Sequence, residues 1–172
     1  ERIQEFDLAS YDVVAFGGVF LKFEDLQYLS SRIRENYRHI FQTVGGNMAT
    51  MTPDVVLKRT QVDCICLYEG EETIIDLIQT LEKGTDWRDV KSIKYRDENG
   101  APISSPSRPK LSAEKVPRLP DRESWDFDLI RKAYPVGSPG RYSAVVFASR
   151  GCPFTCTFCK PLTGKEIRTR EI

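Results

Sequence analysis

The chain has 172 residues, and its 25 Lys and Arg balance its 25 Asp and Glu, so the formal net charge is zero. This balance argues against a nucleic-acid-binding groove, because a basic excess supplies most of the affinity for a phosphate backbone. The longest apolar stretch, residues 13–21, is about nine residues long, whereas a membrane-spanning helix needs about 20. No transmembrane segment is therefore expected.

The cysteine pattern gives a first indication of the compartment. Five cysteines is an odd number, and they are unevenly placed along the chain, which favours a reducing compartment over a disulfide framework. The chain does not open with a basic and then apolar leader, so the sequence gives no support for secretion. A cytoplasmic location is the prediction.

Short apolar runs alternate with helix-period segments over the first 83 residues. Strands are predicted at residues 11–18, 39–46 and 63–68, and helices at residues 24–37, 53–59 and 71–83. The spacing of the last helix predicts five inward side chains: Ile74, Ile75, Leu77, Ile78 and Leu81. Strand–helix–strand alternation at this spacing predicts right-handed βαβ units and a parallel sheet, which is an α/β fold.

The pattern changes after Gly84. The Asn99–Gly100 pair indicates a hairpin within residues 90–103. Five prolines among residues 101–123 indicate an extended linker. A new apolar strand is predicted at residues 142–148. Three parts follow: residues 1–100, the later part of an α/β domain; residues 101–140, a Pro-rich linker; and residues 141–172, the first strand and loop of another domain.

The strongest chemical motif is a C-x3-C-x2-C run formed by Cys152, Cys156 and Cys159, directly after that last strand. Three thiolates on one loop can bind three irons of a four-iron four-sulfur cluster and leave the fourth iron open. The alternatives are a zinc knuckle or three unrelated thiols. Zinc sites usually have four ligands, and the single histidine, His39, lies far away in the sequence.

This motif, with the aromatic Phe158 before its last cysteine, resembles the signature of the radical S-adenosylmethionine superfamily. The resemblance implies that the loop follows the first strand of a (β/α) barrel and that Cys152, Cys156 and Cys159 hold a 4Fe-4S cluster. It also implies that the open iron chelates S-adenosylmethionine, with Phe158 beside the adenine. A reductant such as flavodoxin or ferredoxin would supply the electron.

The upstream region is similar to the branch of that superfamily with a flavodoxin-like (Rossmann-like) cobalamin-binding domain. The family's Gly-Glu-Gly-Glu motif has Tyr68 in place of its first glycine here. The resemblance implies cobalamin contacts at Gly17, Gly18, Gly45, Gly46, Glu69, Gly70 and Glu71. Ordinary turn glycines are the alternative, and the two glutamates also suit the first turn of a helix.

The expected function is that of a fragment of a cobalamin-dependent radical S-adenosylmethionine enzyme, acting on a small-molecule substrate by methyl transfer or oxidative cyclisation. The alternative is a non-catalytic cofactor-binding or structural module with an empty cluster loop. The cysteines of a second pair, Cys64 and Cys66, are interpreted as buried small apolar residues. A half-sheet with an open edge also predicts a possible homodimer.

Overall fold

The computed structural model describes residues 7–17, 23–115, 148–159 and 162–169. Within the chain, two compact units are distinguished, Glu1–Pro109 and Lys110–Ile172. No helix in the described ranges is long and apolar enough to cross a membrane.

The first unit contains a five-stranded sheet in the order β1-β2-β3-β4-β5. Its strands are β1 (Val13–Phe16), β2 (Phe41–Val44), β3 (Cys64–Cys66), β4 (Ile93–Arg96) and β5 (Pro102–Ser104). The first three strands are parallel, whereas β4 and β5 are antiparallel to their neighbours. The α/β class predicted from the sequence is confirmed, and the hairpin extends the parallel sheet into a mixed one.

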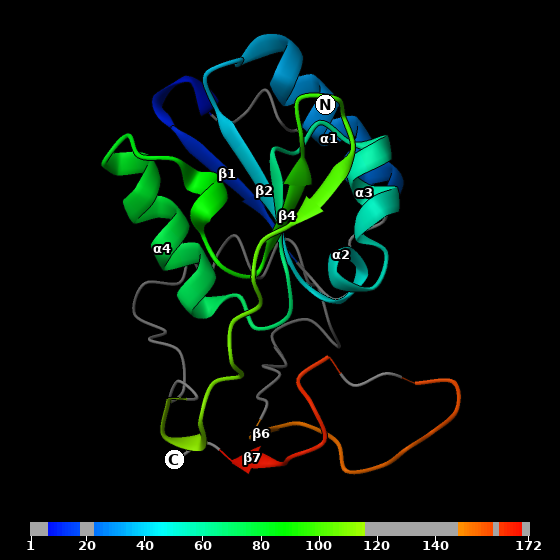
Figure 1. The fold of residues 1–172 in the computed structure, drawn as a ribbon. Helices are drawn as coiled ribbons and strands as arrows, with labels where there is room; N and C mark the ends of the chain where they lie inside the picture. The colour runs from blue at the N-terminus through cyan, green and yellow to red at the C-terminus, as the bar shows by residue number, and fades with distance from the viewer. Residues whose placement is uncertain (1–6, 18–22, 116–147, 160–161, 170–172) are drawn as a thin grey trace, which may run out of the picture. The chain divides into compact units, whose positions relative to one another are not determined.

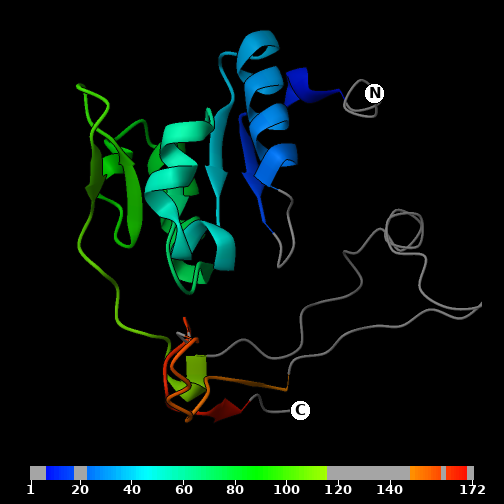
Figure 2. The ribbon, with the colours of Figure 1, turned by 90° about the vertical axis from the view of Figure 1, so that its right-hand side faces the viewer.

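Helices cover both faces of this sheet. They are α1 (Phe23–Asn36), α2 (Asn47–Met51), α3 (Pro53–Arg59) and α4 (Glu71–Glu82). Figures 1 and 2 show α4 on one face and the other three helices on the opposite face. Pro53 occupies the first turn of α3, where its missing N–H leaves no bond unmade.

The alternation of side chains along β3 divides the core in two. Ile65 points towards α1, α2 and α3 and is packed in a cluster with Leu26 and Val56. Cys64 and Cys66 point to the other face and pack with Leu77 of α4. This is the period-2 pattern of a strand that is buried on both faces.

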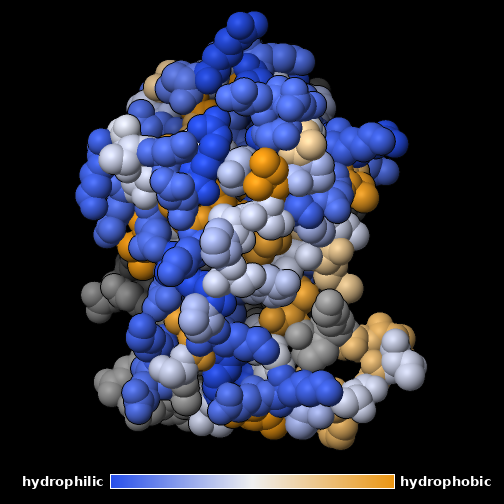
Figure 3. Space-filling model, viewed as in Figure 1, coloured by the Kyte–Doolittle hydropathy of each residue, from blue (hydrophilic) through white to orange (hydrophobic). Residues whose placement is uncertain are grey.

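The outer surface in the view of Figure 3 is mainly hydrophilic, with apolar side chains in small patches.

The prediction of five inward residues in the last helix was wrong for two of them. Leu77 is fully buried, but Ile75 is 54% exposed and Ile78 is 39% exposed. The face of α4 that is buried against the sheet is narrower than the apolar run in the sequence of the helix. The edge strand β1 is itself only partly buried, so it does not cover the outer apolar side chains of α4. Ile78 instead lines an open groove with Val13 of β1.

The segment after the hairpin is bonded to the first unit as far as Arg108. The Ser92 N–H donates to the Pro106 carbonyl at 2.9 Å, and the Arg108 N–H donates to the Ser92 hydroxyl at 2.7 Å. The Arg108 side chain forms ion pairs with Asp76 and Glu72. The first nine residues of the stretch predicted as a linker thus include β5 and close against α4.

The described part of the second unit comprises residues 110–115, with a short 3-10 helix η4 (Ala113–Lys115), and a loop between two short strands, β6 (Ser149–Arg150) and β7 (Arg168–Thr169). These strands are antiparallel, with Arg150 opposite Arg168. Most of the strand predicted at residues 142–148 lies outside the described residues. The three cysteines of the C-x3-C-x2-C run lie on the loop that begins where β6 ends.

Candidate functional site

The base of the cysteine loop is closed by backbone hydrogen bonds. The Gly151 N–H donates to the Thr163 hydroxyl at 3.1 Å, and the Cys152 N–H donates to the Gly164 carbonyl at 3.0 Å. Gly151 has a φ of +99°, and a Cβ there would lie 1.9 Å from the Glu166 carbonyl oxygen. Only glycine fits this position, because any side chain would overlap the backbone of the returning strand.

The cysteines themselves point mainly into solvent. Cys152 is partly buried, while Cys156 and Cys159 are exposed. The Cys159 N–H donates to the Cys156 carbonyl at 3.2 Å, which forms a tight turn between them. Among the described residues, no three His, Cys, Asp or Glu side chains are gathered closely enough to hold a metal ion. The donor set suits an iron–sulfur cluster chemically, and the loop is open.

Phe158, predicted to lie beside an adenine, is 91% exposed. A large aromatic side chain seldom remains so exposed without a partner. Its neighbour on the loop, Phe154, is 69% exposed. The structure thus places two aromatic rings on the same exposed loop as the three thiols, and the sequence analysis singled out one of them.

A second candidate region lies where β1, β2 and β3 end. Parallel strands bring the glycine-bearing loops to one edge of the sheet: the Gly45 N–H donates to the Phe16 carbonyl at 2.9 Å, next to Gly17. Cys66, at the end of β3, has its Cβ 3.8 Å from where a Cβ at Gly45 would lie and 4.0 Å from the same point at Gly70. Ligands of open parallel sheets bind outside such strand ends.

The structure therefore brings most of the predicted cobalamin-contacting residues to this edge. Gly46 is the N-cap of α2, and Gly70 is the N-cap of α4. Glu71 lies in the first turn of α4, and Glu69 directly precedes Gly70. Gly18 lies outside the described residues. The acidic first turn of α4 favours hydrogen-bond donors such as amides and hydroxyls over a phosphate, because the carboxylates offset the positive helix end.

The backbone conformation at Tyr68 explains why the family motif has a glycine at this position. Its φ is +62°, in the left-handed region, where a residue with a side chain is strained. Its N–H donates to the Thr50 hydroxyl at 3.1 Å, which ties the loop after β3 to α2. Its ring is 50% exposed. The departure from the motif therefore strains the backbone at this position and places an aromatic ring at the candidate edge.

Cys64 and Cys66 are buried on the α4 face, as the sequence analysis interpreted them. The Thr43 hydroxyl lies 3.4 Å from the Cys64 sulfur and 3.5 Å from the Cys66 sulfur. A hydrogen bond with Cys66 and then burial raise the pKa of the Cys64 thiol well above its usual range. A thiol with a raised pKa is a poor nucleophile at neutral pH, which suits a packing role.

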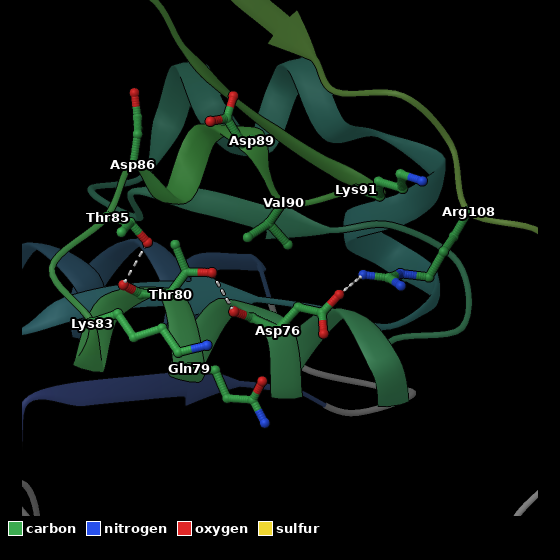
Figure 4. Close-up of a pocket in the computed structure, with 10 residues that line it drawn as sticks. All are labelled: Asp76, Gln79, Thr80, Lys83, Thr85, Asp86, Asp89, Val90, Lys91 and Arg108. Carbon is green, nitrogen blue, oxygen red and sulfur yellow. Dashed lines mark hydrogen bonds and ion pairs between the residues drawn. The ribbon is translucent and has the colours of Figure 1, made fainter.

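A polar hollow of about 440 Å³ lies along α4, away from the strand ends. Figure 4 shows Arg108 reaching across it to Asp76, with Lys83 and Gln79 on the helix side. Arg108 is paired with two carboxylates, so its charge is already balanced. The sequence analysis missed this hollow, because no motif marks a residue from the Pro-rich stretch that folds back onto a helix.

The chain is similar to known proteins over most of its length. No protein-family model matches the chain. An uncharacterized methyltransferase of Pyrococcus horikoshii is 30% identical over 159 residues, which cover 91% of this chain and 32% of the relative. The anaerobic magnesium-protoporphyrin IX monomethyl ester cyclase of Synechocystis is 30% identical over 128 residues, which cover 74% of this chain and 24% of the relative.

A solved structure shows the same likeness in three dimensions. The cobalamin-dependent S-adenosylmethionine radical enzyme OxsB, with aqua-cobalamin and S-adenosylmethionine bound, superposes with a TM-score of 0.72 at 26% identity. The match covers 98% of this chain and 22% of that chain. The resemblance to cobalamin-dependent radical S-adenosylmethionine enzymes predicted from the motifs is confirmed. The chain spans about a third or less of the length of these proteins.

Proposed function

We propose that this chain is the cofactor-binding segment of a cobalamin-dependent radical S-adenosylmethionine enzyme. The observation that carries the proposal is the C-x3-C-x2-C loop after β6. The similarity to OxsB covers 98% of the chain and so includes the α/β sheet as well. In this proposal Cys152, Cys156 and Cys159 hold a 4Fe-4S cluster, and the open iron binds S-adenosylmethionine. When bound and reduced by an external electron donor, such a cluster would supply the one electron needed for reductive cleavage of S-adenosylmethionine.

The donor set supports this assignment. Three thiols within eight residues of one loop match the iron–sulfur preference for thiolate ligands. The exposed ring of Phe158, beside Cys159, is available to contact an adenine. The two hydrogen bonds from the Gly151 and Cys152 N–H groups, called the clamp below, fix the start of the loop. To bind the cluster, only the exposed part of the loop with Cys156 and Cys159 has to close.

Iron and sulfide analysis after anaerobic reconstitution tests the cluster. We expect about four irons per chain and their loss in Cys152→Ala, Cys156→Ala and Cys159→Ala. Cys64→Ser and Cys66→Ser are the matched controls, because these thiols are buried in the first unit and should leave the iron content unchanged. Iron that persists in the loop variants would refute the assignment.

The alternative is a non-catalytic module whose cluster loop stays empty. One observation favours it: the described residues contain no gathered metal-binding group. This alternative predicts no iron in the wild-type chain under conditions that load other iron–sulfur proteins. The same reconstitution experiment therefore separates the two functions.

We further propose that the edge formed by the ends of β1, β2 and β3 binds cobalamin. A Cβ at Gly17 would meet no atom within 4 Å, which leaves room for a ligand beside this residue, and Gly45 and Gly70 lie at the same edge. In this proposal Glu69, before the N-cap glycine of α4, and Glu71, in the first turn of α4, also lie beside the ligand. The substrate, and the choice between methyl transfer and oxidative cyclisation, depend on residues beyond those described.

A titration followed by cobalamin absorbance tests this edge. Gly45→Ala is the informative variant, because a Cβ there makes ordinary contacts at 3.7 and 3.8 Å and leaves the fold intact. We expect weaker cobalamin binding in Gly45→Ala than in the wild type. Asn99→Ala, at an exposed position in the hairpin turn at the other end of the sheet order, should bind as the wild type does. Equal binding by all three proteins would refute the proposed edge.

The edge of β1 supports the proposal of self-association. In the described part of the chain β1 pairs with β2 alone, and the nearby Ile75 and Ile78 are exposed. An unpaired strand edge is a template for another strand. Light scattering should therefore show a dimer that Ile78→Lys weakens, and a monomer at high concentration would contradict this proposal.

A further inference from the structure

Arg168 is a buried arginine in the second unit. Only 3% of its surface is exposed, although a guanidinium is costly to remove from water unless its N–H groups are bonded. Its Nη1 donates to the Leu111 carbonyl at 2.5 Å, and its Nη2 donates to the Thr163 carbonyl at 2.6 Å. The guanidinium thus joins two segments that lie 52 residues apart in the sequence.

One of these two segments holds the cysteine loop. Thr163 accepts the Gly151 N–H through its hydroxyl and the Arg168 guanidinium through its carbonyl. The next residue, Gly164, accepts the Cys152 N–H. The guanidinium is therefore bonded to the turn that fixes the first cysteine of the loop.

We propose that Arg168 is a positioning residue for the iron–sulfur cluster. It holds the turn at Thr163 and Gly164 against Gly151 and Cys152, so that the Cys152 thiol is presented in a fixed register. This inference rests on the proposed function. The β6–β7 ladder is only two residues long on each side, so hydrogen bonds beyond the ladder are needed to keep the loop closed.

An arginine suits this role better than a lysine. The guanidinium is planar and presents its N–H groups in a fixed fork, so it can bond two carbonyls in different segments at once. A lysine ammonium is a compact charge on a flexible stem and would not hold both segments in one geometry. Arg168→Lys should therefore restore only part of the function.

Resistance of the reconstituted cluster to an iron chelator tests the inference. We expect Arg168→Gln to retain the cluster about 10–100-fold less tightly, the usual effect of losing a group that orients a metal ligand. Arg168→Lys should be intermediate. Lys165→Gln is the control, because it removes the same charge from an exposed side chain of the same segment and should behave as the wild type.

Two further measurements separate positioning from loss of fold. Thr163→Val removes the hydroxyl that accepts the Gly151 N–H but keeps both Arg168 bonds, and it should weaken cluster retention in the same direction. The paramagnetic resonance spectrum of the reduced cluster should differ between Arg168→Lys and the wild type, because the Cys152 ligand is oriented differently. A purely structural arginine would change the amount of cluster but not this spectrum.

The outcomes distinguish this inference from the proposed function. If the wild type takes up no iron, the proposed function fails and the role of Arg168 fails with it. If the wild type forms a cluster and Arg168→Gln and Thr163→Val retain it equally well, the proposed function stands and the positioning role is overturned.

Discussion

The two units of this chain are stabilised in different ways. In the first, β3 is buried on both faces, and two apolar clusters pack against it. In the second, the described residues include one buried large apolar side chain, Leu111, and the cysteine loop is held by backbone hydrogen bonds and Arg168. The first unit is thus specified by its own apolar core, whereas the described loop of the second is held mainly by a few hydrogen bonds.

The largest expected effect comes from the core of the first unit. Ile65→Ala removes a fully buried side chain from the centre of the sheet, and we expect it to lower the free energy of unfolding by about 2–5 kcal/mol. Ile75→Ala is the matched control, because Ile75 is 54% exposed. Denaturant unfolding followed by circular dichroism measures both variants. Equal losses in the two would contradict the burial of β3.

Gly151→Ala should break the second unit while leaving the first intact. A Cβ at this position would overlap the Glu166 carbonyl, so the loop cannot keep its clamp. We expect reconstituted iron to fall to the level of Cys152→Ala, with no change in the unfolding of the first unit. Gly17→Ala, where a Cβ meets no atom within 4 Å, controls for the substitution itself. Normal iron content in Gly151→Ala would show that the clamp is dispensable.

A smaller effect is expected at Tyr68. Glycine in place of a tyrosine with left-handed backbone conformation removes about 1–2 kcal/mol of backbone strain. It also increases the conformational-entropy cost of folding by about 0.5–1 kcal/mol. Tyr68→Gly should therefore raise the free energy of unfolding by about 0–1.5 kcal/mol. Tyr68→Asn should also stabilise, since asparagine tolerates this region. A loss of stability in both variants would mean that packing of the Tyr68 ring stabilises the fold by more than the backbone strain at its positive φ destabilises it.

The sequence predicted the first unit well where periodicity and burial agree. The helix over residues 71–83 is observed as Glu71–Glu82, because it is bounded by an N-cap glycine and by Gly84. The same periodicity overestimated its buried face at Ile75 and Ile78, since hydrophobicity alone does not reveal how wide a sheet lies beneath a helix. The antiparallel addition of β4 and β5 to the parallel sheet depends on long-range pairing, which the Asn99–Gly100 turn signal does not encode.

The candidate site was predictable only in its ligands. Cys152, Cys156 and Cys159 are recognisable by spacing, but the bonds that hold their loop come from Thr163 and Arg168. No spacing rule in the sequence identifies Arg168 as a buried donor, because its role depends on two carbonyls that only the folded chain brings together. Tyr68 was recognised as a departure from a motif, and its positive φ gives the physical reason.

The most direct test of the central claim is the paramagnetic resonance spectrum of the reduced, reconstituted chain with and without S-adenosylmethionine. Three cysteine ligands leave one iron open, so the account predicts a cluster signal that changes when S-adenosylmethionine is added and is absent in Cys156→Ala. A cluster signal that is present but unaffected by S-adenosylmethionine would contradict an open iron site on this loop.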